Sequence, residues 1–192
     1  MIIRRKKKGF TVTELVIAMT IMITVLGILW AMFSISNKTI SDVTIKSDLQ
    51  SEGQAIQEKL SNIMMQATVI KSIDGDSLTG EINSIKFESY GSDLNLEEFA
   101  IEKVESGDNY KDGGKNYKLS IRNNVNTNNL TISNNVKSIK ISNPEVIQYS
   151  GEALRNVKTA EFYIILKKEN GYSKNIEYPI SIKARFRNNS KG

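Results

Sequence analysis

The 192-residue chain contains neither cysteine nor histidine. Without cysteine there is no disulfide bond and no thiol nucleophile, and without histidine there is no imidazole to act as a general base or metal ligand. The remaining residues form no recognisable catalytic constellation. We therefore expect a protein that is not an enzyme and has no cofactor, no metal and no small-molecule substrate. Any domain outside the cell must be stabilised by its packed core alone.

Proline is almost absent as well, with only Pro144 and Pro179 in the chain. A proline in a helix interior removes a backbone hydrogen bond and kinks or breaks the helix. Its absence from the first 143 residues allows one continuous helix from about Phe10 to Ile70. Gly27 and Gly53 are the positions in that helix where bending would cost least.

Charge is missing from the stretch Leu15–Asn37, which has no Lys, Arg, Asp or Glu. As a helix, this stretch would be about 35 Å long, enough to cross the hydrocarbon core of a membrane with some tilt. One acid, Glu14, stands at its entrance. A carboxylate in lipid costs free energy unless it is paired, and the obvious partner is a free α-amino group. That group would exist if the chain were cut directly before Phe10.

The formal net charge of +5 comes from the N-terminus, where positions 4–8 are all basic. Without these five, 21 of the 26 basic residues remain, against 21 acidic residues. The rest of the chain is therefore close to neutral. Its overall charge gives no reason to expect binding to nucleic-acid phosphates.

The segment Lys6–Leu15, with its basic run, Gly9-Phe10 junction and Glu14, resembles the class III signal of type IV prepilins and pseudopilins. The resemblance implies that a prepilin peptidase cuts between Gly9 and Phe10 on the cytoplasmic side and methylates the new amino group of Phe10. Glu14 would become the fifth residue of the mature chain, where the family keeps its glutamate. It would then pair with the methylated amine of a neighbouring subunit during assembly.

The same resemblance implies a structural function. The chain would be a minor pilin or pseudopilin of a type IV pilus or type II secretion-like filament, assembled through its N-terminal helix. Its partners would be other pilin or minor pilin subunits, the prepilin peptidase, and an assembly platform with its ATPase. It would be a single-pass membrane protein with a cytoplasmic N-terminus and an outer head, and later part of an extracellular filament. Pilus, secretion and DNA-uptake (competence) machines all stay open.

Two other interpretations of the N-terminus compete with this one. An ordinary secretory signal could be cleaved near the small residues at 34–36, but its apolar core would be longer than the usual stretch of about 7–15 residues. A plain membrane anchor explains the length, and the basic cluster would keep the N-terminus cytoplasmic. It does not explain Glu14 or the Gly9-Phe10 junction. The alternative function is a single-pass anchored extracellular ligand-binding or sensor domain.

Beyond Lys38 the pattern becomes amphipathic. Apolar residues recur at helical spacing and form one face of a helix that can cover a sheet: Ile45, Leu49, Ile56, Leu60, Ile63, Ala67 and Ile70. These patterns divide the chain into four expected segments: a basic leader (1–9), a membrane or filament-core helix (10–36), an amphipathic second half of that helix (37–72) and a β-rich head (73–192).

The head is expected to be an antiparallel sheet. Its strand-like runs are Ser84–Tyr90, Phe99–Val104, Tyr117–Arg122, Leu130–Ser133, Val136–Ile141, Val157–Lys167 and Tyr172–Phe186. Turns are expected at Asp74–Asp76, at Thr79-Gly80 and at Asn170-Gly171, and exposed loops at 108–115 and 123–129. Pro179 indicates an edge strand or a bulge. The predicted fold class is α+β, a pilin-like lollipop. The run Ile182–Asn188 loosely resembles the C-terminal strand of larger minor pilins and J-type pseudopilins.

Three features of the head look like sites but are better explained otherwise. The segment Asp74–Ser77 begins like a calcium loop, yet the twelfth position is Ile85 rather than an acid. Asp108 and Asp112, near a glycine pair, leave calcium open as a minor alternative. We expect packing rather than ligand stacking from three tyrosines: Tyr149, Tyr163 and Tyr172.

Overall fold

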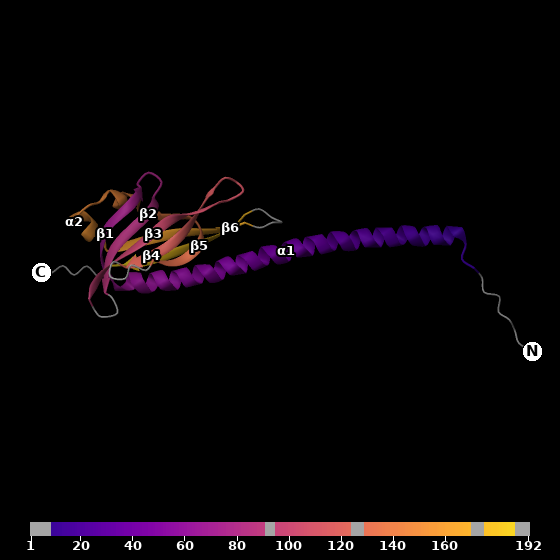
Figure 1. Ribbon diagram of the computed structural model, residues 1–192, viewed down its shortest axis with the longest axis horizontal. Coiled ribbons are helices and arrows are strands. Elements are labelled where there is room, and N and C mark those ends of the chain that lie inside the picture. Colours follow the sequence, from indigo (N-terminus) through magenta and orange to yellow (C-terminus); the bar gives the residue numbers. More distant parts are fainter. Residues whose placement is uncertain (1–8, 91–94, 124–128, 170–174, 187–192) are drawn as a thin grey trace, which may run out of the picture. The chain divides into compact units, whose positions relative to one another are not determined.

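The computed structural model describes residues 9–90, 95–123, 129–169 and 175–186 (Figure 1). The elements are α1 (Val12–Gln66), β1 (Ala67–Asp76), β2 (Glu81–Tyr90), β3 (Leu96–Asn109), β4 (Lys115–Asn123), β5 (Leu130–Ile141), η1 (Pro144–Gln148), α2 (Glu152–Arg155), β6 (Thr159–Lys168) and β7 (Ile176–Arg185). A long N-terminal helix is followed by a seven-stranded antiparallel sheet, which confirms the predicted α+β class. The chain divides into two compact units, residues 1–41 and 42–192.

The sheet of the second unit follows chain order from β1 to β7. Sequential antiparallel strands can be joined by short turns, so this order needs no long crossover. One additional pairing modifies it, because Glu81 at the start of β2 pairs with Lys140 of β5. β2 pairs with β3 only as far as Ser84 and Glu102. Beyond this point β3 pairs only with β4, whereas β4 continues to pair with β5, for example Tyr117 with Val136.

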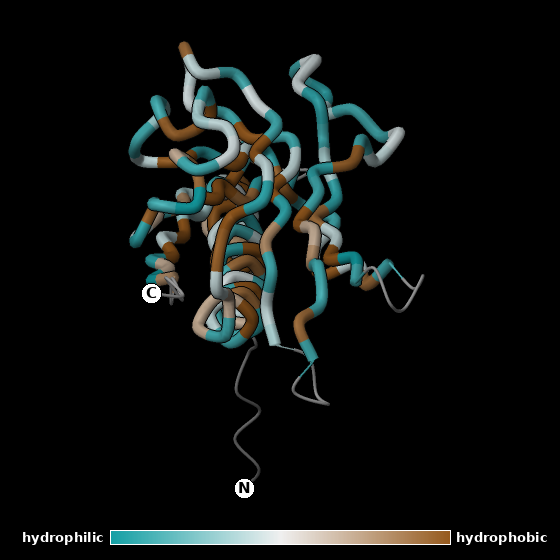
Figure 2. Tube along the Cα trace, turned by 90° about the vertical axis from the view of Figure 1, so that its left-hand side faces the viewer, coloured by the Kyte–Doolittle hydropathy of each residue, from teal (hydrophilic) through white to brown (hydrophobic). Residues whose placement is uncertain are grey.

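The second half of α1 covers this sheet with the predicted apolar stripe. Leu49, Ile56 and Leu60 are at most 1 % exposed, and Met64, which the predicted stripe did not include, is also buried. Figure 2 shows apolar and polar segments alternating along the strands, the pattern of a sheet with one face in a core. The helix residues share one core cluster with strand residues that include Ile82, Ile139, Phe162, Ile164, Leu166, Ile180 and Ile182. Burying each such side chain contributes roughly 1.5–3 kcal/mol.

The predicted end of the helix near Ile70, and the segment boundary at 72, were wrong. α1 ends at Gln66, and Ala67 and Ile70 lie in β1, where they pair with Ser89 and Phe87 of β2. Residues 68–70 are all β-branched and favour a strand. The spacing of Ala67 and Ile70 fits the buried face of a helix, and both residues are also buried in the strand. Their apolar spacing alone therefore could not show where the helix ends and the strand begins.

The predicted turn at Asp74–Asp76 was also wrong. These residues belong to β1, with an irregularity in the pairing between Asp74 and Gly75. The turn instead comprises residues 77–80, as expected at Thr79-Gly80, and the positive φ of 72° at Gly80 suits glycine. Asp76 stabilises it, since its carboxylate accepts hydrogen bonds from the Leu78 amide and the Thr79 hydroxyl, both at 2.9 Å. These two donors hold the pKa of Asp76 below its usual value.

The other strand predictions hold with shifted ends. Each predicted run from Ser84 to Ile141 falls inside a strand, and the two runs from Leu130 to Ile141 form the single strand β5. β6 begins at Thr159, two residues later than expected. Of the predicted loop at 108–115, the first two residues and the last lie in strands. The Asn170-Gly171 turn, Tyr172, residues 124–128 and the end of the run to Asn188 lie outside the described residues.

Both outer strands of the sheet are protected. η1 and α2 lie against β1. At the opposite edge, Pro179 of β7 has no N–H to offer, and the Gln57 side chain of α1 donates a hydrogen bond of 3.0 Å to the Ser181 carbonyl. The edge position predicted for Pro179 is thus confirmed. Covered or proline-containing edges discourage pairing with a strand of another molecule.

Candidate functional site

The first half of α1 exposes apolar side chains on every side. Trp30 is 72 % exposed and Ile23 71 %, and the most apolar window of the helix has no buried residue. By length and composition, α1 can cross a membrane. A soluble surface helix keeps one polar face, so a helix that is apolar all round requires lipid or other apolar helices around it. Within the described part of the first unit, residues 9–41, no other segment covers these apolar side chains.

Two threonine hydroxyls within this apolar segment are satisfied by their own helix. The hydroxyl of Thr20 donates to the carbonyl of Val16, and that of Thr24 donates to the carbonyl of Thr20, both at 2.8 Å. A hydroxyl that bonds back to its own helix brings no unpaired donor into lipid. The two threonines are therefore compatible with a membrane span.

Glu14 closes the N-terminus of α1 through a reciprocal pair with Thr11. The Glu14 carboxylate accepts hydrogen bonds from the Thr11 amide at 2.9 Å and the Thr11 hydroxyl at 3.0 Å, and the Glu14 amide donates to that hydroxyl at 3.3 Å. This is a capping box, and it places a negative charge at the positive end of the helix dipole. The Thr-x-x-Glu spacing could have predicted it from sequence, but the role expected for Glu14 was assembly.

Gly9 and Phe10 precede the helix and are fully accessible. Phe10 is 89 % exposed, and a Cβ added at Gly9 would meet no atom within 4 Å. Of the predicted site residues, Glu14 thus hydrogen-bonds to Thr11, the residue directly after Phe10, while Gly9 and Phe10 themselves stay accessible. Cleavage, methylation of Phe10 and the pairing of Glu14 with an amine stay predictions.

Residues 4–30 match the family described as the prokaryotic N-terminal methylation motif. The chain carries a type IV pilin-like N-terminal signal. Comparison of the whole chain with curated proteins and with solved structures gives no match. The pilin-like motif and the apolar helix fit a membrane-anchored protein that assembles with other pilins, and they favour a structural subunit over an enzyme.

Asp112, considered above as a calcium ligand, is engaged by other groups. Its carboxylate accepts hydrogen bonds from the Lys167 ammonium at 2.5 Å and the Asn175 amide at 2.8 Å. The hydrogen bond from Lys167 is the main reason why the pKa of Asp112 lies below its usual value. Among the described residues, no group of three or more acidic side chains could hold a metal ion.

Asp112 and Lys167 belong to a cluster with Tyr110 that connects the tip of the β3–β4 hairpin to β6. Lys167, with only 4 % of its side chain exposed, lies 4.2 Å from the ring centre of Tyr110. The Tyr110 hydroxyl donates a hydrogen bond to Asn116 Oδ1 at 2.9 Å or to the Lys167 carbonyl at 3.1 Å. Burial, with a contribution from the charge of Asp112, raises the pKa of Tyr110 to about 12. The cluster serves the docking of the hairpin rather than ligand binding.

Proposed function

We propose that this protein is a minor pilin or pseudopilin, a non-enzymatic subunit of a type IV pilus or type II secretion-like filament. One combination of observations carries the proposal: the methylation motif at residues 4–30 opens a helix whose apolar surface is exposed on all sides. Such a surface requires lipid before assembly and neighbouring helices afterwards.

In this proposal the four segments have separate roles. Residues 1–9 form a cytoplasmic leader that the prepilin peptidase removes, and the amino group of Phe10 is then methylated. Residues 10–36 hold the subunit in the membrane, with the head outside, until an assembly ATPase and a platform protein move it into the filament. There, packing among the N-terminal helices supplies most of the cohesion. The amphipathic second half of the helix covers the sheet, and the β-rich residues after it form the rest of the head.

Glu14 would accept a charge-assisted hydrogen bond from the methylated amine of Phe10 on a neighbouring subunit. The two opposite charges would neutralise each other in the low-dielectric core of the filament. An accessible Phe10 only one residue before the capping box supports this role, because the carboxylate already lies at the start of the helix.

The first test is the mature N-terminus. We expect intact mass and N-terminal sequencing of the membrane-extracted protein to give a chain that begins at Phe10 and carries a methyl group. Gly9→Leu should abolish cleavage, because the peptidase needs a small side chain beside the scissile bond, whereas Gly27→Leu, inside the helix, should leave cleavage unchanged. A Gly9→Leu protein cleaved like the wild type would contradict the proposed junction.

The alternative function, a single-pass anchored ligand-binding or sensor domain, needs no processing. A native chain that keeps residues 1–9 in cells with an active prepilin peptidase would favour that function. A start near Asn37 would indicate an ordinary secretory signal instead.

A further inference from the structure

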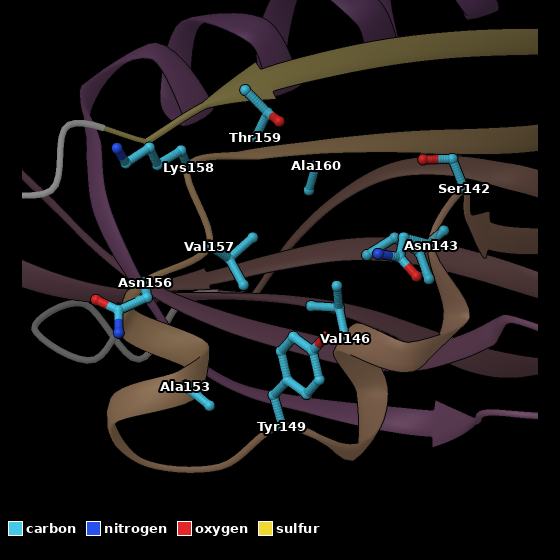
Figure 3. A pocket seen from close by; sticks show the side chains of 11 residues that line it. Ser142, Asn143, Val146, Tyr149, Ala153, Asn156, Val157, Lys158, Thr159 and Ala160 are labelled. Carbon is cyan, nitrogen blue, oxygen red and sulfur yellow. The ribbon is translucent and has the colours of Figure 1, made fainter.

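The head carries an open hollow of about 300 Å³ where the segment that contains η1 and α2 leaves β5 and returns to β6 (Figure 3). Ligand pockets in proteins typically measure about 300–1,000 Å³, so this one suits a ligand of about one sugar ring. It lies in the second unit, separate from the N-terminal signal. None of the proposed functions of α1 uses it.

The floor of the hollow is apolar. Ile141, Val146 and Ala160 are at most 6 % exposed, and Val157 beside them is partly buried. Val146 is held there by η1, which begins at Pro144. A wholly polar ligand would leave this floor unmatched, so the hollow favours a ligand with a small apolar group.

One wall is the ring of Tyr149, which is 40 % exposed and faces the hollow in Figure 3. An exposed aromatic face offers a stacking surface to a flat or ring-shaped ligand, and the phenol hydroxyl can donate or accept a hydrogen bond. The sequence predicted only packing for Tyr149. In the structure its ring lines an accessible hollow.

The other end of η1 offers an oriented amide. Asn143 caps η1, and its Oδ1 accepts a hydrogen bond from the Glu145 amide at 3.3 Å. This bond orients the side chain and leaves its Nδ2 group available as a donor toward the hollow. Ser142, Lys158 and Thr159 also line the hollow, although Figure 3 shows the side chains of Lys158 and Thr159 directed away from it. No lining residue is acidic.

We propose that this hollow binds an N-acetylated sugar unit. The acetamido methyl group fits the apolar floor, its carbonyl can accept from Asn143 Nδ2, and the sugar ring can stack on Tyr149. A plain hexose lacks the group that matches the floor. The ligand class is thus set by the combination of an apolar floor, an oriented amide donor and an aromatic wall.

The experiment uses the full chain in lipid nanodiscs and saturation-transfer NMR with N-acetylglucosamine as the probe and glucose as the matched sugar without an acetamido group. We expect binding of N-acetylglucosamine in the millimolar range, with the strongest transfer to the acetyl methyl protons, and at least about tenfold weaker binding of glucose. No binding of N-acetylglucosamine, or equal binding of both sugars, would overturn the proposal.

Variants locate the site. Tyr149→Ala should weaken binding of N-acetylglucosamine by about tenfold, from loss of the stacking surface. Asn143→Asp removes the donor but keeps an acceptor suited to capping η1, so binding should weaken while thermal unfolding stays unchanged. The control is Tyr163→Ala, which removes a tyrosine of similar exposure, 42 %, from β6 outside the hollow. An equal effect of Tyr163→Ala would show that binding occurs elsewhere. The outcome is independent of whether the N-terminus is processed.

Discussion

At the scale of single residues, Glu14 has two possible roles that the wild-type chain cannot separate. It caps its own helix through Thr11, a role that needs only a hydrogen-bond acceptor. It is also proposed to neutralise an amine in a filament core, a role that needs a negative charge. Glutamine has the same shape as glutamate but no charge, so it can fulfil the first role and not the second.

Glu14→Gln therefore tests which role matters. Glutamine can accept the hydrogen bond from the Thr11 amide but carries no charge, and a buried amine left unpaired costs about 3–5 kcal/mol. We expect Glu14→Gln and Glu14→Ala to insert into the membrane normally and both to fail to enter filaments, as measured by immunoblot of membrane and sheared-filament fractions. Thr11→Ala, which weakens the cap alone, should assemble. Normal assembly of Glu14→Gln would reject the charge-pairing role.

Tyr110 predicts an alkaline limit to the stability of the head. Its pKa is raised to about 12 in the folded protein, mainly by burial, from about 10 in an unfolded chain. The folded state therefore favours the protonated phenol. That stability is fully present below pH of about 10 and is lost as the pH rises through about 12.

We expect the unfolding midpoint to fall across this range in the wild type and to fall less in Tyr110→Phe. The phenylalanine variant should be less stable at neutral pH, because it loses the hydrogen bond of the phenol hydroxyl to Asn116 or to the Lys167 carbonyl. Tyr149→Phe, at an exposed site outside this cluster, serves as the control. Identical pH profiles for wild type and Tyr110→Phe would show that another group limits the alkaline stability.

At the scale of elements, the contact between α1 and β7 depends on a glycine. Gly53 is buried, and a Cβ added there would lie 2.9 Å from Tyr178 Cε1 and 3.1 Å from Ile180 Cδ1. From its sequence alone, Gly53 is a position where the helix would bend at little cost. The structure gives it another role, since the missing side chain makes room for the Tyr178 ring against the helix.

Gly53→Ala sets two effects against each other. Alanine improves helix propensity by about 1 kcal/mol, whereas overpacking a well-filled contact costs about 1–3 kcal/mol. We expect net destabilisation by about 1 kcal/mol in denaturant unfolding. The double variant Gly53→Ala/Tyr178→Leu should recover most of the loss. If Gly53→Ala alone stabilises the protein, the ring of Tyr178 moves aside freely and the glycine is not needed for packing.

At the scale of the whole molecule, all buried core residues of the described chain lie between Leu49 and Phe186, within the second unit. The first unit contributes none of them. About 150 residues with one continuous core are enough for an independent domain.

We expect a fragment of residues 42–192 to be soluble and to unfold cooperatively, as measured by circular dichroism during heating. A reducing agent should leave its midpoint unchanged, because the chain has no cysteine. A fragment starting at Ala67, which lacks the helix stripe, should fail to fold and serves as the control. A disordered 42–192 fragment would mean that its core is completed by a partner subunit.

The sequence by itself determined the features that depend on local order along the chain. The basic run, the Gly9-Phe10 junction, Glu14 and the uncharged stretch after it are contiguous, so they predicted the pilin-like signal and the membrane-competent helix without any knowledge of the fold. The period of the apolar residues predicted the helix that covers an antiparallel sheet. These signals needed no partner from a distant part of the chain.

Only the tertiary structure decided the features that depend on distant partners. Ala67 and Ile70 had helical spacing but became a strand, because pairing with β2 buries them equally well. Lys167 is charged and ends a predicted strand-like run, but its side chain is buried against Tyr110 of the β3–β4 hairpin. Tyr149 became the wall of a hollow only when η1 and β6 met. Burial, ion pairing and concave surfaces arise between segments far apart in sequence, and local patterns carry no information about which segments meet.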